Sequence, residues 1–232
     1  MNKETQEMNM LKRTIASRGE RLSVNPSENQ EIMVKANRYD AAIVMAPAMP
    51  DMDHITGSDI YVRETVAKML AHANGKLQAA GFNLIAGYGY RAPGIQQKYW
   101  EQAIALVKEE HPDWTDMQAI EDEADKRAAD PQVAGHITGG CVDVTVGRGV
   151  APLDMGVPLC DFTAGLRRIK TFGEGLTAEQ MSNRMILYQV MTEAGFMPFF
   201  GEYWHFMYGD REWAYFSGLD ESLYSSKSDF RP

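Results

Sequence analysis

The spacing of hydrophobic residues changes several times along the chain, and each spacing predicts an element. Steps of three and four predict a helix after residues 56–59, with an apolar face formed by Val62, Val66, Met69, Ala73 and Leu77. Thr56 and Asp59 have the spacing of a capping box, so we expect this helix to begin there. Gly81 is expected to end it.

Three more helices are indicated by their start and stop signals. One runs from about residue 94 to residue 110, where Pro112 closes it. Thr115 and Gln118 suggest a capping box before a short acidic helix that ends near residue 130. Thr177 and Gln180 suggest another for a helix that reaches residues 194–195.

Strands are expected in both halves of the chain, and those that carry the polar residues come late. Residues 82–86 form an apolar run typical of a buried strand, and 141–146 alternate with β-branched residues. A final strand or strand pair is expected at 196–208, after a Gly- and Pro-rich loop at about 147–175. Residues 42–50 are apolar but broken by two prolines, which indicates a short strand or a docked loop. Early helices and late strands favour the α+β class.

The length favours one domain with an appendage. The chain has 232 residues, and a domain usually has roughly 100–200. Residues 1–45 are polar and weakly periodic, so we expect an N-terminal extension that packs on the domain or is partly mobile. Residues 46–232 are then expected to form a single domain.

The charge and the cysteines narrow the classes of partner. A net charge of −9 without a basic stripe argues against nucleic-acid binding. No apolar run approaches the roughly 20 residues of a membrane span. The first residues lack the apolar core of a secretory signal, so a cytoplasmic protein is expected. Two cysteines, Cys141 and Cys160, make no disulfide framework and suit a reducing compartment.

Two segments carry candidate chemistry, residues 135–143 and 201–205. They offer His136, Asp143 and His205 as metal ligands, with Glu202 beside the last histidine. Two imidazoles and a carboxylate, with a fourth position for water, form the ligand set of a catalytic zinc site. Zinc lowers the pKa of its bound water, and a carboxylate that does not bind the metal takes the proton during attack.

The spacing of these residues requires two irregularities. His136 and Asp143 are an odd number of residues apart, so on one straight strand they would face opposite sides. Gly139 and Gly140 lie between them and allow a sharp bend. Glu202 and His205 have the same parity, so a bulge or a strand end is expected there.

Ordinary interpretations exist for each residue taken alone. A single histidine at a strand end is usually a surface or hydrogen-bonded residue. The run Asp51-Met52-Asp53-His54 resembles a metal cluster, but without partners a turn is the better interpretation. Cys141 shares strand parity with Asp143, which would place its thiol near the metal, but a small buried core residue is the better interpretation.

The joint pattern resembles the zinc D-Ala-D-Ala peptidases, in particular the D-alanyl-D-alanine dipeptidases of the VanX type. The similar motifs are His-x6-Asp, the later Glu-x-Trp-His, Gly89-Tyr90-Arg91-Ala92-Pro93, Met155-Gly156 followed by Cys160-Asp161-Phe162, and the loop Asp53-His54-Ile55-Thr56-Gly57. They cover about residues 51–208 in family order. The resemblance implies a small antiparallel sheet that carries the zinc site and packs against helices.

The resemblance also implies a role for each site residue. His136, Asp143 and His205 would hold one Zn2+, and Glu202 would act as general base and then as acid. Arg91 would stabilise the oxyanion, and Asp161 would receive the free ammonium group of a dipeptide substrate. The family commonly has a serine two residues before the first ligand histidine, where this chain has Ala134. A looser preference for D-Ala-D-Ala is therefore expected.

Three functions remain open at this point. The first is a zinc dipeptidase acting on D,D-dipeptides, and the second is a carboxypeptidase or endopeptidase acting on peptidoglycan peptides. The third is a non-catalytic zinc-binding module, which the presence of both Glu202 and Arg91 disfavours. The oligomeric state cannot be deduced from the sequence.

Overall fold

The structure, a computed structural model, describes residues 15–232, and its centre is a mixed sheet. The strand order is β2-β4-β5-β8-β7, with β6 beside β5, and all pairs are antiparallel except β2 with β4. The strands are β2 (Val44–Met45), β4 (Asn83–Tyr88), β5 (Cys141–Arg148), β6 (Ala151–Pro152), β7 (Met197–Pro198) and β8 (His205–Met207). A separate antiparallel pair joins β1 (Met33–Lys35) to β3 (Tyr61–Arg63). The α+β class is confirmed.

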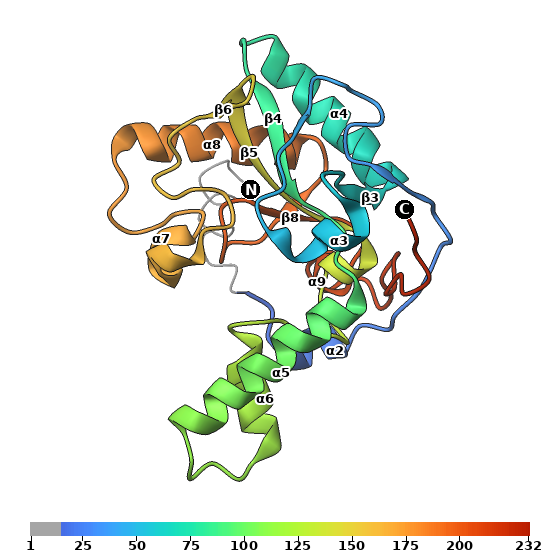
Figure 1. Cartoon of the computed structure of the whole chain (residues 1–232), viewed down its shortest axis with the longest axis vertical. Coiled ribbons are helices and arrows are strands. Elements are labelled where there is room, and N and C mark those ends of the chain that lie inside the picture. The colour runs from blue at the N-terminus through green and yellow to red at the C-terminus, as the bar shows by residue number, and fades with distance from the viewer. Residues whose placement is uncertain (1–14) are drawn as a thin grey trace.

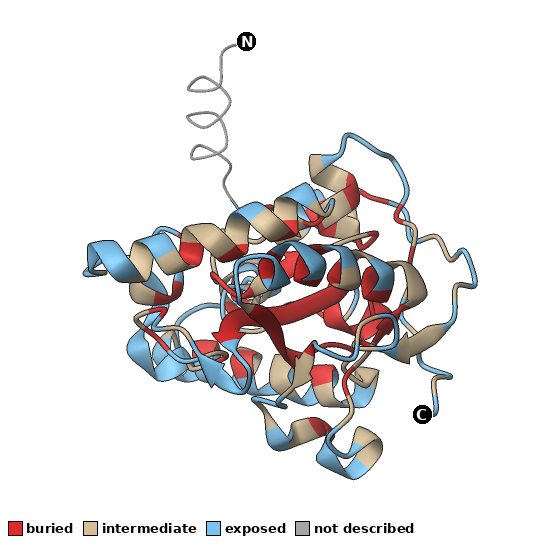
Figure 2. Cartoon of the chain, turned by 90° about the horizontal axis from the view of Figure 1, so that it is seen from above, coloured by how far each residue is buried: buried red, intermediate tan, exposed pale blue. Residues whose placement is uncertain are grey.

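Helices α4 (Glu64–Gln78) and α8 (Ala178–Glu193) pack against each other and against the sheet. Figure 2 shows the buried residues gathered on the strands and on the inner faces of these helices. Leu70 of α4, Leu84 of β4 and Val144 of β5 are fully buried in this core. Removing such a side chain from water stabilises a fold by roughly 1.5–3 kcal/mol, so this packing fixes the sheet that carries the candidate site.

Helices α5 (Pro93–Glu110) and α6 (Met117–Asp125) project from the sheet as a hairpin (Figure 1). They share a small core of their own, formed by Ala103, Val107, Ile120 and Ala124. The first turn of α5 nevertheless stays beside the end of β4, because only four residues separate the two elements. Among residues 15–232, no helix combines the length and the apolar character that a membrane crossing requires.

Short elements complete the fold. They are α2 (Arg18–Leu22), α3 (Asp53–Thr56), α7 (Leu166–Ile169), α9 (Arg211–Phe216) and the 3-10 turns η1 (Pro50–Met52), η2 (His136–Thr138) and η3 (Phe162–Ala164). Residues 15–45 pack on the domain through the β1–β3 and β2–β4 pairs and a bridge between Asn25 and Glu221. Residues 1–14 of the expected extension lie outside the described residues, and the division of the chain at residue 45 stays a prediction.

A buried arginine ties both ends of the domain to its middle. The Arg63 side chain, 0% exposed, forms a two-bonded ion pair with Glu28 at 2.7 and 2.8 Å. It also donates to the carbonyl oxygens of Glu31 at 2.7 Å, Thr138 at 2.7 Å and Ser225 at 3.3 Å. The guanidinium therefore satisfies its donors only when residues 28–31, 138 and 225 are all in place.

Several expected elements are confirmed. Strands occur at 83–88 and 141–148, helices at 93–110 and 178–193, and short strands within 196–208. The capping box of α8 has both of its bonds, from Gln180 N to Thr177 Oγ1 at 3.2 Å and from Thr177 N to Gln180 Oε1 at 2.9 Å. The loop at 147–175 also contains β6, η3 and α7.

Two helix starts were wrong. The helix expected after Asp59 begins at Glu64, because Val62 pairs with Val34 in the β1–β3 ladder and Asp59 forms an ion pair with Lys35. That long-range strand pairing overrides the local helical period. Helix α6 is capped by Asp116, which accepts from Gln118 N at 2.9 Å, and not by Thr115.

Candidate metal centre and active site

The three expected metal ligands form one compact cluster. His136 begins η2, Asp143 lies in β5 and His205 begins β8. One ligand atom from each lies within 4.8 Å of the others, and no second cluster of this kind occurs in the part of the chain that the structure describes. Asp143 and His205 are direct cross-strand partners, which explains why their side chains meet.

The chain bends where the spacing required it. After η2, Gly139 has φ +74°, and a Cβ on Gly140 would lie 2.4 Å from the carbonyl oxygen of Tyr208. This turn brings His136 back beside Asp143, so the expected bend is confirmed. Glu202 lies in the turn that precedes β8, with His205 N donating to its carbonyl oxygen at 3.2 Å. The strand end expected there is also confirmed.

Hydrogen bonds orient the donor atoms. His136 Nδ1 donates to the carbonyl oxygen of Gly89 at 2.7 Å, which leaves Nε2 facing Asp143 Oδ2 at 3.4 Å. The other oxygen of Asp143 lies 2.8 Å from His205 Nδ1. Two ligands at ~2.1 Å from a tetrahedral zinc ion lie roughly 3.4 Å apart, so the first of these separations already suits the ion.

The ionisation of the cluster is compatible with a bound cation. Burial lowers the pKa of His136, so its imidazole is neutral, as a metal ligand must be. Burial alone would raise the pKa of Asp143, but the two histidines hold it well below its usual range. Burial likewise opposes a charge on His205, yet the bond to Asp143 and its charge raise the pKa of His205 to about 9. A proton on His205 thus balances the buried Asp143 carboxylate, and Zn2+ would take over that role by replacing the proton.

Glu202 has the properties of a general base. Its carboxylate lies in the field of His205, Asp143 and Arg91, and burial raises its pKa to about 7. The charge of Asp143 acts in the same direction, while His205, Arg91 and a hydrogen bond from Trp204 oppose the increase. Trp204 Nε1 donates to Glu202 Oε2 at 2.9 Å. A carboxylate poised near neutral pH can both accept and return a proton.

Arg91 lies between β4 and α5 and is held on several sides. Its Nε donates to Tyr88 Oη at 3.0 Å, and its Nη1 donates to Gln96 Oε1 at 2.7 Å. The guanidinium carbon lies 4.8 Å from the ring centre of Tyr88 and 5.2 Å from that of Tyr99. The Tyr88 ring in turn contacts the His136 ring edge-on at 5.1 Å. Arg91 is therefore fixed beside the metal cluster.

A comparison with family models identifies the family of the chain. The family model described as D-Ala-D-Ala dipeptidase matches residues 30–226, which is most of the chain. The chain belongs to this peptidase family. No curated protein matches it. The family is one of zinc-dependent peptidases, so the protein is a zinc metallopeptidase, and its cofactor is Zn2+.

Solved structures with a similar chain path have low sequence identity. The LD-carboxypeptidase LdcB is 17% identical, with 84% of this chain and 81% of that chain covered and a TM-score of 0.49. A mutant of the vancomycin-resistance D,D-pentapeptidase VanY in complex with Zn(II) is 19% identical, with 69% and 81% covered and a TM-score of 0.39. VanYB in complex with D-Alanine-D-Alanine is 18% identical, with 78% and 86% covered and a TM-score of 0.41.

Asp161, the expected reader of the substrate ammonium group, lies at the start of η3. Its Oδ1 accepts from Thr163 N at 2.9 Å and from Thr163 Oγ1 at 2.6 Å, and these bonds lower its pKa. The preceding residue, Cys160, places its Sγ 3.6 Å from Asp143 Oδ2. The loop thus turns Cys160 toward the metal cluster, and the substrate-binding role of Asp161 stays a prediction.

Cys160, and not Cys141, is the thiol beside the metal cluster. Cys141 is fully buried and donates to Asp210 Oδ2 at 3.0 Å, which supports its interpretation as a buried core residue. Cys160 lies against the cluster instead, at a positive φ of 58°. The sequence did contain one indication that Cys160 lies near the site, because Cys160 directly precedes Asp161 in a motif of the family.

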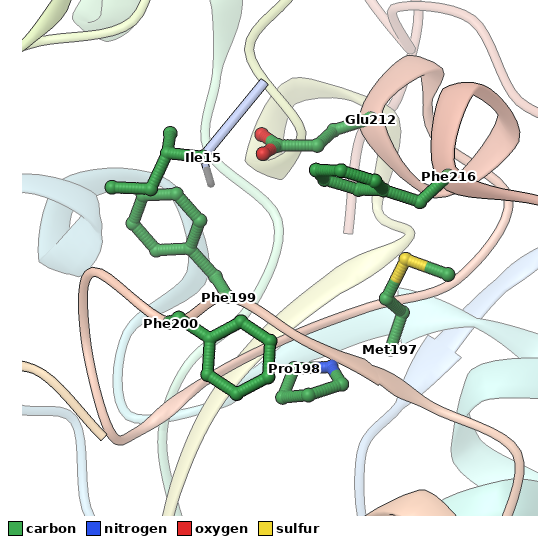
Figure 3. Close-up of a pocket in the computed structure, with 7 residues that line it drawn as sticks. All are labelled: Ile15, Met197, Pro198, Phe199, Phe200, Glu212 and Phe216. Carbon is green, nitrogen blue, oxygen red and sulfur yellow. The ribbon is translucent and has the colours of Figure 1, made fainter. Parts of the chain in front are cut away.

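Figure 3 shows a small, mostly apolar pocket. It is lined by Ile15, Met197, Pro198, Phe199, Phe200, Phe216 and the carboxylate of Glu212. The ring of Phe199, one of its lining residues, contacts the His205 ring with 5.5 Å between the ring centres. Its free volume of about 10 Å³ is room for roughly one water molecule, which excludes it as the dipeptide site.

Proposed function

We propose that this zinc peptidase is a dipeptidase that hydrolyses D-Ala-D-Ala or related D,D-dipeptides. The observation that carries the proposal is the meeting of His136, Asp143 and His205 at 4.8 Å or less, with Glu202 and Arg91 beside them. The family match over residues 30–226 supports the same substrate class. In this assignment the three clustered residues hold the metal, and Glu202 and Arg91 perform the proton transfer and the charge stabilisation.

The chemistry divides among the residues of the chain. Bound zinc supplies a Lewis acid and an acidified water. Glu202 takes the proton of the attacking water on a carboxylate oxygen and returns it to the nitrogen of the leaving amino acid. The Arg91 guanidinium stabilises the negative charge that develops on the carbonyl oxygen. Tyr88 and Gln96 take the Nε–H and one Nη1–H of Arg91, so beyond these two bonds the second Nη1–H and both Nη2–H donors can face a substrate oxygen.

The residue that binds the free amino group of the substrate distinguishes the dipeptidase from a second candidate function. A dipeptidase needs a group that binds a free ammonium, and Asp161 is the residue we assign to it. Its Oδ1 already caps η3 through Thr163, and Ala134 offers no hydroxyl to assist. This observation favours a carboxypeptidase acting on longer peptidoglycan peptides as the second candidate, because such an enzyme does not require a free amino group next to the scissile bond.

One comparison of substrates decides between the two. Zinc-loaded protein is assayed with D-Ala-D-Ala, its N-acetyl derivative, and matching L,D- and L,L-dipeptides, each with and without a chelator. The dipeptidase assignment predicts cleavage of the free D,D-dipeptide and little cleavage of the acetylated one. Asp161→Asn should then lower kcat/KM for the free dipeptide about 10- to 150-fold, the cost of one charge-assisted hydrogen bond.

Other outcomes of the same assay point elsewhere. Equal cleavage of free and acetylated substrates would transfer the assignment to a carboxypeptidase and remove the ammonium-binding role of Asp161. Absence of any chelator-sensitive cleavage, in protein that contains zinc, would favour a non-catalytic zinc-binding module. Thr163→Val, which removes one of the two bonds to Asp161 Oδ1, is a matched control because it keeps the carboxylate.

A further inference from the structure

We infer that Asp51 and Tyr88 are positioning residues for Arg91, an inference that rests on the role proposed for Arg91 above. Asp51 belongs to the Asp51-Met52-Asp53-His54 run that the sequence indicated as a turn, and it lies in η1. Neither residue was assigned to the site from the sequence. The structure connects both to the guanidinium by a continuous chain of hydrogen bonds.

The chain of bonds runs from Arg91 through Tyr88 to Asp51. Arg91 Nε donates to Tyr88 Oη at 3.0 Å, and the same hydroxyl donates to Asp51 Oδ2 at 2.7 Å. Tyr99 Oη donates to that oxygen as well, at 2.9 Å, and Arg91 Nε lies 3.9 Å from it. One carboxylate oxygen thus binds both tyrosines whose rings contact the guanidinium.

Burial and charge both help to hold the Arg91 guanidinium in one orientation. The side chains of Arg91 and Asp51 are only 14% and 12% exposed, so their attraction is weakly screened by water. Each tyrosine hydroxyl carries one proton, and both Tyr88 and Tyr99 donate it to Asp51 Oδ2. The Tyr88 hydroxyl donates to Asp51 and accepts from Arg91 Nε, so these two bonds hold the guanidinium in the observed orientation.

Tyr88 also connects this chain to the metal side of the site. It is paired with Asp143 across the β4–β5 ladder, just after a register shift, and its ring contacts the His136 ring. A shift of Tyr88 therefore changes the position of Arg91 relative to the cluster. Misplacing a catalytic group by about 1 Å can cost on the order of 100-fold in rate, so we expect this chain of bonds to affect kcat.

The competing interpretation is purely structural. Asp51 would hold residues 50–57 on the domain through the two tyrosines, with no effect on the reaction itself. Loss of such a bond would lower the melting temperature and the amount of folded protein, but kcat per zinc-loaded molecule would stay constant. The two interpretations therefore differ in kcat and in how the variants combine with a change of Arg91.

The test measures kcat and KM for Tyr88→Phe and Asp51→Asn, each alone and combined with Arg91→Ala. We expect kcat to fall about 10- to 100-fold in each single variant, with KM changed less than about 3-fold, because the bonds act on the transition state. In the Arg91→Ala background, either change should lower kcat by less than about 3-fold further, because the guanidinium that it positions is no longer there. Zinc content should stay at one ion per chain.

Tyr90→Phe is the matched control. Tyr90 is next to Arg91 in the chain, but its hydroxyl donates to the carbonyl oxygen of Lys227 at 2.7 Å and not toward the guanidinium. It should lose stability without the fall in kcat. Nitrogen NMR of zinc-free protein gives a readout apart from activity, since the Arg91 Nε–H signal should lose its exchange protection in Tyr88→Phe and Asp51→Asn and keep it in Tyr90→Phe.

The outcomes are distinguishable. Unchanged kcat in both single variants, or losses that multiply fully with that of Arg91→Ala, would overturn the positioning role and leave the proposed function intact. If Arg91→Ala itself kept wild-type kcat, the role of Arg91 in the proposed function would be wrong, and this inference would fall with it. If Asp51→Asn does not fold, Tyr88→Phe alone decides the question.

Discussion

Replacing Trp204 with phenylalanine should move the pH dependence of the reaction without touching any proposed ligand. The fully buried indole donates from Nε1 to Glu202 Oε2 at 2.9 Å. This bond favours the charged carboxylate and so lowers a pKa that burial has raised to about 7. Without the donor, the pKa of Glu202 must rise further.

The magnitude follows from the type of bond. A hydrogen bond to a charged group contributes roughly 1.5–3 kcal/mol, and one pKa unit corresponds to about 1.4 kcal/mol. Trp204→Phe should therefore raise the pKa of Glu202 by about one to two units. Glu202 acts as a base when it is ionised, so activity is lost as the pH falls through this pKa. Bound zinc lowers the pKa in both proteins, and the difference between them is the quantity to measure.

The assay is kcat/KM against pH for zinc-loaded protein. The acid limb of Trp204→Phe should lie about one to two units above that of the wild type, while the plateau at high pH changes little. Tyr203→Phe is the control, because it removes a neighbouring buried donor whose partner is the carbonyl oxygen of Val157, at 2.8 Å. Acid limbs within about 0.3 units of each other in wild type and Trp204→Phe would refute the reasoning, as would equal shifts in both variants.

Three further results are expected. His136→Ala and His205→Ala should each lose nearly all zinc by metal analysis, because two remaining donors bind the ion weakly, and full zinc retention in both would disprove the ligand assignment. Glu202→Gln should keep zinc and lower kcat about 10²- to 10⁴-fold, whereas wild-type turnover would place the proton transfer elsewhere. Ala134→Ser should sharpen the preference for D-Ala-D-Ala over bulkier D,D-dipeptides, measured as a ratio of kcat/KM values, and an unchanged ratio would exclude a role for the missing hydroxyl.

The sequence predicted best what depends on near neighbours in the chain. The Thr177–Gln180 capping box and the bend at Gly139 need only a few adjacent residues, and both are present. The helix start at Asp59 was wrong because the pairing of Val62 with Val34 joins residues that no local pattern connects. Only the folded structure could reveal that pairing.

The same difference between local patterns and long-range contacts explains which residues of the candidate site could be predicted. Its donors could be named because residue types and spacing restrict a zinc set strongly. The residues around Arg91 could not be named from the sequence, because they come from three separate elements: Asp51 from η1, Tyr88 from β4 and two residues from α5. Gln96 and Tyr99 are three apart on that helix, so a shared face was visible, but its target was not.

The buried arginine in β3 has a consequence for synthesis of the chain on the ribosome. All proposed zinc donors have been made once residue 205 is added, yet Arg63 still lacks the Ser225 carbonyl as an acceptor. The same guanidinium holds the Thr138 carbonyl, two residues after His136. A nascent chain that ends before residue 225 therefore contains all three proposed zinc ligands. It still lacks the Ser225 carbonyl, one of the acceptors that hold Arg63, and Arg63 in turn holds the loop that carries His136. We expect high-affinity zinc uptake to be a late, post-translational event that follows docking of the carboxyl-terminal segment.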